Sequence, residues 1–122
     1  MSEIERLESN PRLSRVVLHN GVAWLSGIVA ADCSEGIGGQ TRQVLAQLER
    51  LLEQAGSSRT RILSAQIWMK DMVADFDCMN EVWSQWFSPG ETPARATAQV
   101  VFDDEQIRLE LIVVAAQSPV TD

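Results

Sequence analysis

The 122-residue sequence has one histidine, two cysteines and no tyrosine, and these scarcities exclude several kinds of site. His19 has no cluster of Cys or Glu at zinc-ligand spacing, and we interpret it as a side chain at the end of a strand. Cys33 and Cys78 form no CxxC or metal-like pair, which favours free thiols in a reducing compartment. We therefore expect a cytoplasmic protein with no bound metal.

Basic residues and long apolar runs are also scarce. Ten Lys and Arg stand against seventeen Asp and Glu, for a formal net charge of −7. Such a chain lacks the cations that neutralise phosphates, so we expect neither nucleic-acid binding nor docking on anionic membranes. No apolar run approaches the roughly 20 residues of a membrane-spanning helix. The first ten residues contain three Glu and no apolar core, so they do not resemble a secretory signal.

The length and the 45% hydrophobic content predict a single domain over residues 1–122, with tails at 1–10 and 118–122. Asn20-Gly21 between two apolar runs indicates a hairpin. Gly56 marks the end of a first helix, and Ser88-Pro89-Gly90 ends a second one that Asp71 or Asp75 begins. The predicted strands are 15–19, 22–28, 62–69, 94–101 and 106–116, residues 31–39 form a loop, and the helix stripes are Val44, Leu45, Leu48, Leu51, Leu52 and Ala55, then Phe76, Met79, Trp83, Trp86 and Phe87.

The order β-β-α-β-α-β-β predicts an α+β fold, with one mixed sheet of about five strands and two helices on one face. The other face of the sheet still needs cover, and nothing left in the chain supplies it, so we expect a homo-oligomer. The acidic turn Asp103–Glu105 is expected to join the last two strands as a hairpin. That pairing would let Arg95 and Glu110 approach each other or a common cleft.

Arg95 and Glu110 have two interpretations. Opposed charges on paired strands commonly form a cross-strand ion pair. Alternatively, the planar guanidinium of Arg95 would hold a carboxylate through two parallel hydrogen bonds. The spacing alone does not choose between them. Gly36-Ile37-Gly38-Gly39 precedes a helix but lacks the Lys-Ser/Thr pair of a phosphate-binding loop, so we interpret it as a flexible loop.

Six segments stand in a specific order: LSG (25–27), GQTRQVL (39–45), LLEQAG (51–56), KDMVADFDCMNEVWSQWF (70–87), TPARATAQV (92–100) and RLELIVVAA (108–116). Taken together, they resemble the Rid/YjgF family over residues 14–116. The resemblance implies a chorismate-mutase-like fold and a homotrimer with sites in clefts between subunits. It also implies hydrolysis of reactive enamine and imine intermediates (2-imino acids) to 2-keto acids and ammonia. An iminium carbon is already a strong electrophile, so we expect this reaction to need no metal or organic cofactor.

The same resemblance implies roles for individual residues. Arg95 matches the family's signature arginine, which family members active as deaminases keep, and it would grip the substrate carboxylate. Glu110 matches the glutamate associated with the catalytic water. These matches imply a deaminase of the 2-iminobutanoate/2-iminopropanoate type that takes a small carboxylate as substrate. The positions implied to contact substrate are Ser26, Gly27, Asn80 and Thr97, where Thr97 replaces a frequent Cys.

The N-terminal region departs from the family pattern. Many members carry an aromatic residue there that closes the pocket, whereas Leu13 or a neighbour stands in that region of this chain. The departure keeps a second interpretation open, a non-catalytic module that binds small carboxylates or a protein partner. A ribonuclease is a third interpretation, and the negative charge and the absence of a basic, aromatic-rich patch count against it.

Overall fold

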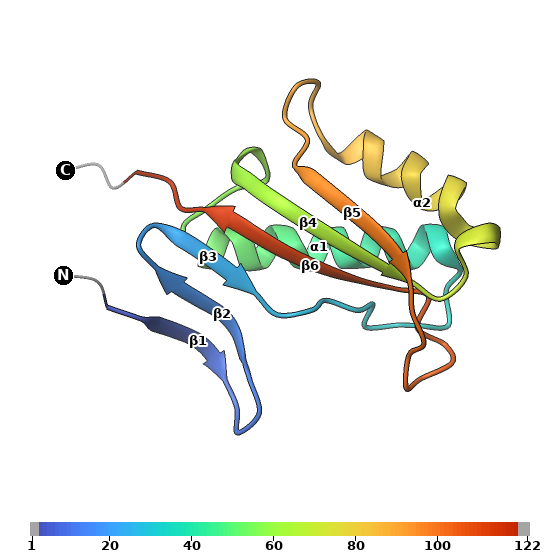
Figure 1. Cartoon of the computed structure of the whole chain (residues 1–122), viewed down its shortest axis with the longest axis horizontal. Coiled ribbons are helices and arrows are strands. Elements are labelled where there is room, and N and C mark those ends of the chain that lie inside the picture. Colours follow the sequence, from blue (N-terminus) through green and yellow to red (C-terminus); the bar gives the residue numbers. More distant parts are fainter. Residues whose placement is uncertain (1–2, 120–122) are drawn as a thin grey trace.

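The computed structural model describes residues 3–119, and within them six strands form one mixed sheet in the order β1-β2-β3-β6-β4-β5 (Figure 1). Both α-helices lie on one face of the sheet, which confirms the predicted α+β class with one strand more than expected. In chain order the elements are β1 (Glu5–Ser9), β2 (Ser14–His19), β3 (Val22–Leu25), α1 (Ile37–Gln54), a short 3-10 helix (Arg59–Arg61), β4 (Ile62–Met69), α2 (Met72–Trp86), β5 (Ala94–Gln99) and β6 (Leu109–Ala116).

The predicted hairpin joins β2 and β3. Asn20-Gly21 adopts positive φ angles of 50° and 77°, as a two-residue turn between twisted strands requires. The turn sets His19 opposite Val22. At the far end of the hairpin the backbone N–H of Ser26 donates to the carbonyl of Arg15 at 2.9 Å. The hairpin therefore ends with Arg15 and Ser26 side by side.

The core lies between the sheet and the helices. The α1 stripe is buried as predicted, and Leu48, Leu51 and Leu52 are 0% exposed. On β6 every second residue from Leu109 to Ala115 is buried against this layer. α1 begins at Ile37, two residues before the end of the predicted loop. The reason is the buried Gln40, whose amide donates to the carbonyls of residues 33, 35 and 106 and holds the loop against the helix start.

Asp71, one of the two proposed caps, begins α2. Its carboxylate accepts a hydrogen bond from the backbone N–H of Ala74 at 3.0 Å. The other candidate, Asp75, lies inside the helix, is 5% exposed and pairs with the Arg108 guanidinium at 3.3 Å. α2 ends at Trp86, just before the predicted break.

The predicted hairpin between the last two strands is wrong. β5 pairs in parallel with β4, while β6 lies between β3 and β4 and is antiparallel to both. The helix α2 connects β4 to β5 as a crossover, and a crossover returns the chain in the same direction. β6 alternates buried and half-buried residues and so occupies the centre of the sheet, whereas β5 has small, mostly exposed residues and forms an edge.

The predicted N-terminal tail is wrong for Glu5–Ser9, which form β1 and pair antiparallel with β2. Asn10 closes the connecting turn, since its Oδ1 accepts from the backbone N–H groups of Arg12 at 2.8 Å and Leu13 at 3.0 Å. Four of the five β1 residues are exposed at the sheet edge, so the strand has no apolar alternation to reveal it. The predicted tail residues 1–2 and 120–122 lie outside the described range.

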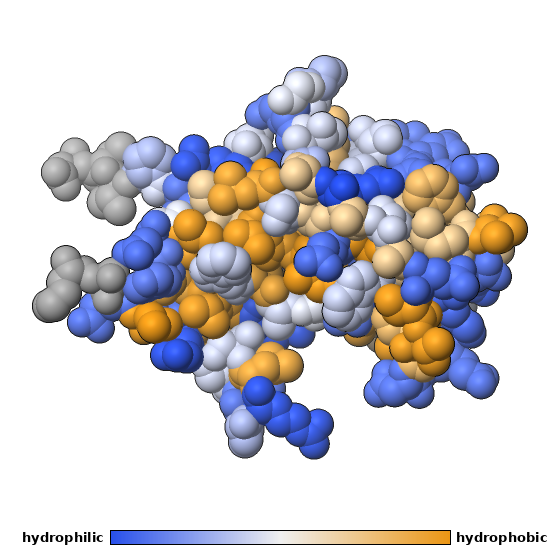
Figure 2. All heavy atoms as spheres, viewed as in Figure 1, coloured by the Kyte–Doolittle hydropathy of each residue, from blue (hydrophilic) through white to orange (hydrophobic). Residues whose placement is uncertain are grey.

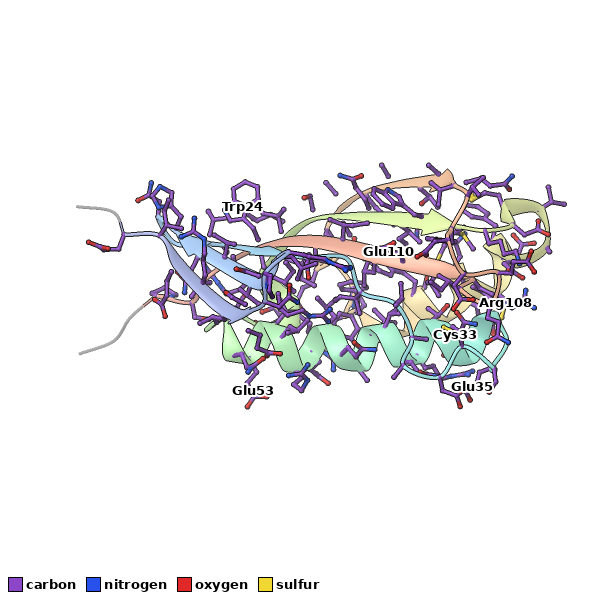
Figure 3. All side chains as sticks on the ribbon, turned by 90° about the horizontal axis from the view of Figure 1, so that it is seen from below. Trp24, Cys33, Glu35, Glu53, Arg108 and Glu110 are labelled. Atoms are coloured by element: carbon purple, nitrogen blue, oxygen red, sulfur yellow. The ribbon has the colours of Figure 1, made fainter. Side chains whose placement is uncertain are left out.

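The face of the sheet opposite the helices, called here the open face, is not covered by any element of residues 3–119. Trp24 is 51% exposed there, Leu63 50% and Trp68 37%. A register irregularity between Ile62 and Ser64 breaks the alternation that would have buried Leu63. Figure 2 shows apolar residues gathered over the middle of this face, and in Figure 3 Trp24 points away from α1. The uncovered face that motivated a homo-oligomer is present, and the homo-oligomer stays a prediction.

Candidate functional site

The predicted site residues form two sets on opposite faces of the sheet. Arg95 is the register partner of the buried Ala65, so its side chain leaves the sheet on the helix side. Glu110 is the partner of the exposed Trp68, so it lies on the open face. Side chains alternate between faces along a strand, and residues 65 and 68 of β4 therefore point in opposite directions. One chain does not bring Arg95 and Glu110 together.

The arginine set consists of Arg95, Thr97 and Asn80. The guanidinium carbon of Arg95 lies 6.0 Å from the ring centre of Phe76 and 5.6 Å from that of Trp83, both on α2. Asn80 shares this face of α2, because it follows Phe76 by four residues and precedes Trp83 by three. Thr97 follows Arg95 by two residues on β5 and so points to the same side.

Arg95 is half-buried, yet its side chain makes no hydrogen bond or ion pair with any residue from 3 to 119. Burial lowers the pKa of the guanidinium, because the charged form loses solvation. A cation held beside two aromatic rings without an internal anion is free to bind an external carboxylate. Arg95 also borders a shallow hollow of about 300 Å³ whose other lining residues are Ser64, Ala65, Gln66, Ala94 and Ala96.

The glutamate set consists of Glu110, Gly27 and Ser26. A Cβ on Gly27 would overlap Oε2 of Glu110, so only glycine leaves room for the carboxylate in this position. The hydroxyl of Ser26 is buried and has no hydrogen-bond partner among the described residues. Reciprocal backbone hydrogen bonds of 2.8 and 2.9 Å between Ile28 and Leu111 fix the two segments against each other. The set is therefore held by backbone pairing on both sides.

The pKa of Glu110 is raised, first by burial and then by the nearby charge of Asp103. Both causes disfavour the carboxylate form. A carboxyl group whose pKa is moved toward neutrality takes a proton from water more readily than an ordinary glutamate does. Groups with such shifts concentrate at functional sites, which makes Glu110 a candidate for proton transfer.

Two residues beside the glutamate set were missed from the sequence. Trp68 lies directly across from Glu110 on the neighbouring strand. Arg15 lies across from Ser26, and the alternation of β2 places its side chain on the open face. A sequence signal for Arg15 exists, because the two-residue turn at Asn20-Gly21 determines which residues of β2 and β3 face each other.

Other features of the described residues lie outside these two sets. The thiol of Cys33 donates to the Ala30 carbonyl at 3.3 Å, and burial raises its pKa, while Cys78 is exposed. Among residues 3–119 no group of three or more His, Cys, Asp or Glu is arranged to hold a metal ion. Over the same residues, no helix has the length and apolar character needed to cross a membrane. A hollow of about 290 Å³ between α1 and α2 contains no predicted site residue.

Similar proteins place the chain in a family. The model of the endoribonuclease L-PSP family matches residues 3–117. The RutC family protein YoaB of Escherichia coli is 35% identical over 116 residues, covering 93% of this chain and 97% of that protein. The human protein named 2-iminobutanoate/2-iminopropanoate deaminase is 30% identical over 114 residues, covering 88% and 82%. A solved structure of a YjgF family member from Neisseria meningitidis is 36% identical, with a TM-score of 0.92 and coverage of 97% and 98%. The chain therefore belongs to the endoribonuclease L-PSP family, which is the Rid/YjgF family that its motifs indicated.

Proposed function

We propose that the protein hydrolyses reactive 2-imino acids to 2-keto acids and ammonia. The observation that carries this proposal is Arg95, a half-buried cation beside two aromatic rings with no anion of its own among residues 3–119. A carboxylate matches the planar fork of such a guanidinium with two parallel hydrogen bonds. The name of the human relative supports the reaction class.

The proposed site is completed by a second copy of the chain. Arg95 and Glu110 lie on opposite faces of the sheet, so each copy supplies one half of the machinery. In a homotrimer, the arginine set of one copy would meet the glutamate set of its neighbour in each cleft. The exposed apolar residues Trp24, Leu63 and Trp68 provide the surface that such an assembly would bury.

In the proposed reaction, Arg95 holds the substrate carboxylate through charge-assisted hydrogen bonds, each worth about 1.5–3 kcal/mol. Glu110 of the neighbouring copy accepts a proton from water while the water oxygen bonds to the carbon of the protonated C=N group, whose π electrons move to the nitrogen. Glu110 then gives this proton to the amino nitrogen. The C–N bond of the tetrahedral intermediate then breaks. Ammonia leaves with the electron pair, and the hydroxyl loses its proton to give the keto group. Proton transfer by Glu110 contributes roughly 10²–10⁴-fold, and orientation of the reactants contributes further.

The remaining site residues fit this arrangement. The unpartnered hydroxyl of Ser26 would hydrogen-bond to the substrate nitrogen or the attacking water. Gly27 leaves the space that the Glu110 carboxylate occupies. Asn80 and Thr97 flank Arg95 and would contact the carboxylate end of the substrate. An imine carbon is already electrophilic, so the proposed reaction needs no metal or organic cofactor.

The test is an imine-hydrolysis assay on the wild type and Arg95→Ala. An amino-acid oxidase acting on alanine generates 2-iminopropanoate, and the loss of the imine is followed with time. Removal of the carboxylate anchor is expected to lower kcat/KM by about 100-fold or more, because bound orientation is lost together with affinity. Arg59→Ala is the matched control: Arg59 also lies over an α2 ring, that of Trp86 at 4.3 Å, but it already pairs with Glu49. Unchanged hydrolysis by Arg95→Ala would remove the proposal.

A second candidate is a non-catalytic module that binds small carboxylates through Arg95. The separation of Arg95 from Glu110 within one chain favours it, because a copy acting alone has the anchor without the base. Calorimetric titration with pyruvate would then show binding that Arg95→Ala abolishes. Wild-type protein would at the same time leave the rate of imine loss unchanged, which distinguishes the module from the enzyme.

A further inference from the structure

Arg15 is a second arginine beside the proposed site, and hydrolysis of a simple 2-imino acid does not use it. The carbonyl of Arg15 accepts from the N–H of Ser26 at 2.9 Å, and Gly27, which contacts the Glu110 carboxylate, is the next residue. The side chain of Arg15 is on the open face, as is Glu110. The long arginine side chain therefore starts on β2, two strands from β6, which carries the proposed catalytic base, and residues 26 and 27 lie between them.

Arg15 has no anionic partner within residues 3–119. The three ion pairs of these residues use the side chains of Arg50, Arg59 and Arg108, and no side-chain hydrogen bond involves Arg15. The side chain is partly buried, so it is not simply a solvated surface charge. Like Arg95, it is a cation positioned to receive an anion from outside the chain.

The surroundings of the glutamate set are acidic, so the unpaired cation of Arg15 beside it bears on which substrate can bind. Glu110 lies close to Asp103, whose charge contributes to the raised pKa of Glu110, and the whole chain carries a formal net charge of −7. A substrate with two carboxylates would be repelled from such a place unless a cation met the second one. A monocarboxylate would need only Arg95. The placement of Arg15 thus matches a dianion better than a monoanion.

We infer that the site prefers 2-imino dicarboxylates, with Arg95 of one copy holding the carboxylate next to the C=N group and Arg15 of the neighbouring copy holding the distal carboxylate. This inference rests on the proposed function and leaves its bond changes the same.

The test compares two imines on the same protein. Amino-acid oxidases generate 2-iminosuccinate from aspartate and 2-iminopropanoate from alanine, and kcat/KM is measured for each. The wild type is expected to favour the dicarboxylate, and Arg15→Ala to lower the ratio of the two kcat/KM values by about 10- to 100-fold, the effect of a lost charge-assisted hydrogen bond. Arg15→Lys, which keeps the charge without the planar fork, should lower the ratio by less.

Arg6→Ala is the matched control for this test. Arg6 pairs with Val17 in the register of β1 and β2, so it lies on the same face one strand farther from Ser26. Its removal takes away the same charge and should leave the ratio within about twofold, since exposed charges at that range are largely screened. Circular dichroism of each variant checks that the sheet is intact.

The outcomes separate this inference from the proposed function. Hydrolysis of 2-iminopropanoate with no preference for 2-iminosuccinate, or an unchanged ratio in Arg15→Ala, would overturn the role of Arg15 and leave the proposed function standing. If Arg15→Ala and Arg6→Ala lowered the ratio of the two kcat/KM values equally, the effect would come from the loss of one positive charge, and the role of Arg15 would also be overturned. Failure to hydrolyse either imine would overturn both proposals together.

Discussion

The two faces of the sheet differ in what completes them. On the helix-covered face, Val16, Ala23 and Val113 are 0% exposed, whereas on the open face Trp24 is 51% exposed although it is the larger side chain. Burial of apolar surface drives folding, so the covered face holds most of the stability that one chain generates by itself. The open face carries Glu110 and Arg15, and we propose that a second copy of the chain covers it. One chain thus builds the hydrophobic core by itself, whereas the proposed active site needs residues from two copies.

The strongest test of this division is complementation between two inactive variants. Arg95→Ala lacks the anchor and Glu110→Gln lacks the base, and each alone is expected to lose about 10²–10⁴-fold in kcat/KM. If every site takes Arg95 from one copy and Glu110 from the next, refolding an equal mixture restores intact sites in about a quarter of the clefts, by random assembly of a closed ring. The measurement is imine hydrolysis by the refolded mixture relative to wild type.

The control for complementation is the same two variants mixed after separate refolding, before subunits exchange. Activity should then stay at the level of the single variants. A site built within one chain would give no recovery in either mixture, because every copy would carry one defect. Such a result would contradict the division of the site between the two faces.

The covered face is expected to govern the free energy of unfolding. Leu52 is fully buried, and Leu52→Ala should lower that free energy by about 2–5 kcal/mol through lost burial and a residual cavity. Leu63→Ala on the open face makes the same chemical change at a side chain that is 50% exposed, and should cost at most about 0.5 kcal/mol at a protein concentration where copies are separate. Urea unfolding followed by tryptophan fluorescence measures both, and equal costs would show that the faces do not differ in this way.

Much of this division could be predicted from the sequence, and the failures have physical causes. The helix stripes and the Asn20-Gly21 hairpin are local patterns, so they were readable. β1 was missed because an exposed edge strand needs no apolar alternation. The position of β6 was missed because strand order is a long-range property, although the strand-helix-strand unit from 62 to 99 already required a parallel pair.

The candidate site was predictable as a set of residues but not as a place. The family motifs select Arg95 and Glu110 individually, and no pattern in the chain says on which face each one lies. The face on which each residue lies depends on the strand order, in which β5 is at the edge of the sheet and β6 lies between β3 and β4. Arg15 carries no family motif in this sequence, and only the hairpin register connects it with Ser26. Geometry was needed to turn six separate matches into two half-sites.

The open face is expected to govern association. Replacement of a large aromatic at the centre of an interface commonly costs about 2 kcal/mol or more, which weakens association about 30-fold. Trp24→Ala should therefore shift the oligomer toward monomers in analytical ultracentrifugation across a dilution series. Val73→Ala on α2 is the control, because Val73 is 97% exposed but lies away from the open face. Equal behaviour of both variants, or a wild type that is monomeric throughout, would break the link between the open face and assembly.

The smallest expected effect concerns the acidity of Glu110, which distinguishes its half-site from an ordinary exposed carboxylate. Burial is the larger cause of its raised pKa and Asp103 the smaller, so Asp103→Asn should lower the pKa while leaving it above the usual value. A base must be ionised to act, so the acid limb of the kcat/KM profile should move to lower pH.

The effect of pH on the stability of the fold follows from the same pKa shift of Glu110. A carboxyl whose folded pKa is raised contributes stability below its unfolded pKa, and that contribution is lost as pH rises through the folded pKa. Asp103→Asn lowers the folded pKa of Glu110, so it narrows the pH range over which this contribution to stability is lost. Glu105→Gln is the control, because it removes a charge from the same turn and Glu105 is not a cause of the raised pKa of Glu110. If both variants displaced the acid limb equally, the effect would come from net charge and not from the Asp103–Glu110 pair.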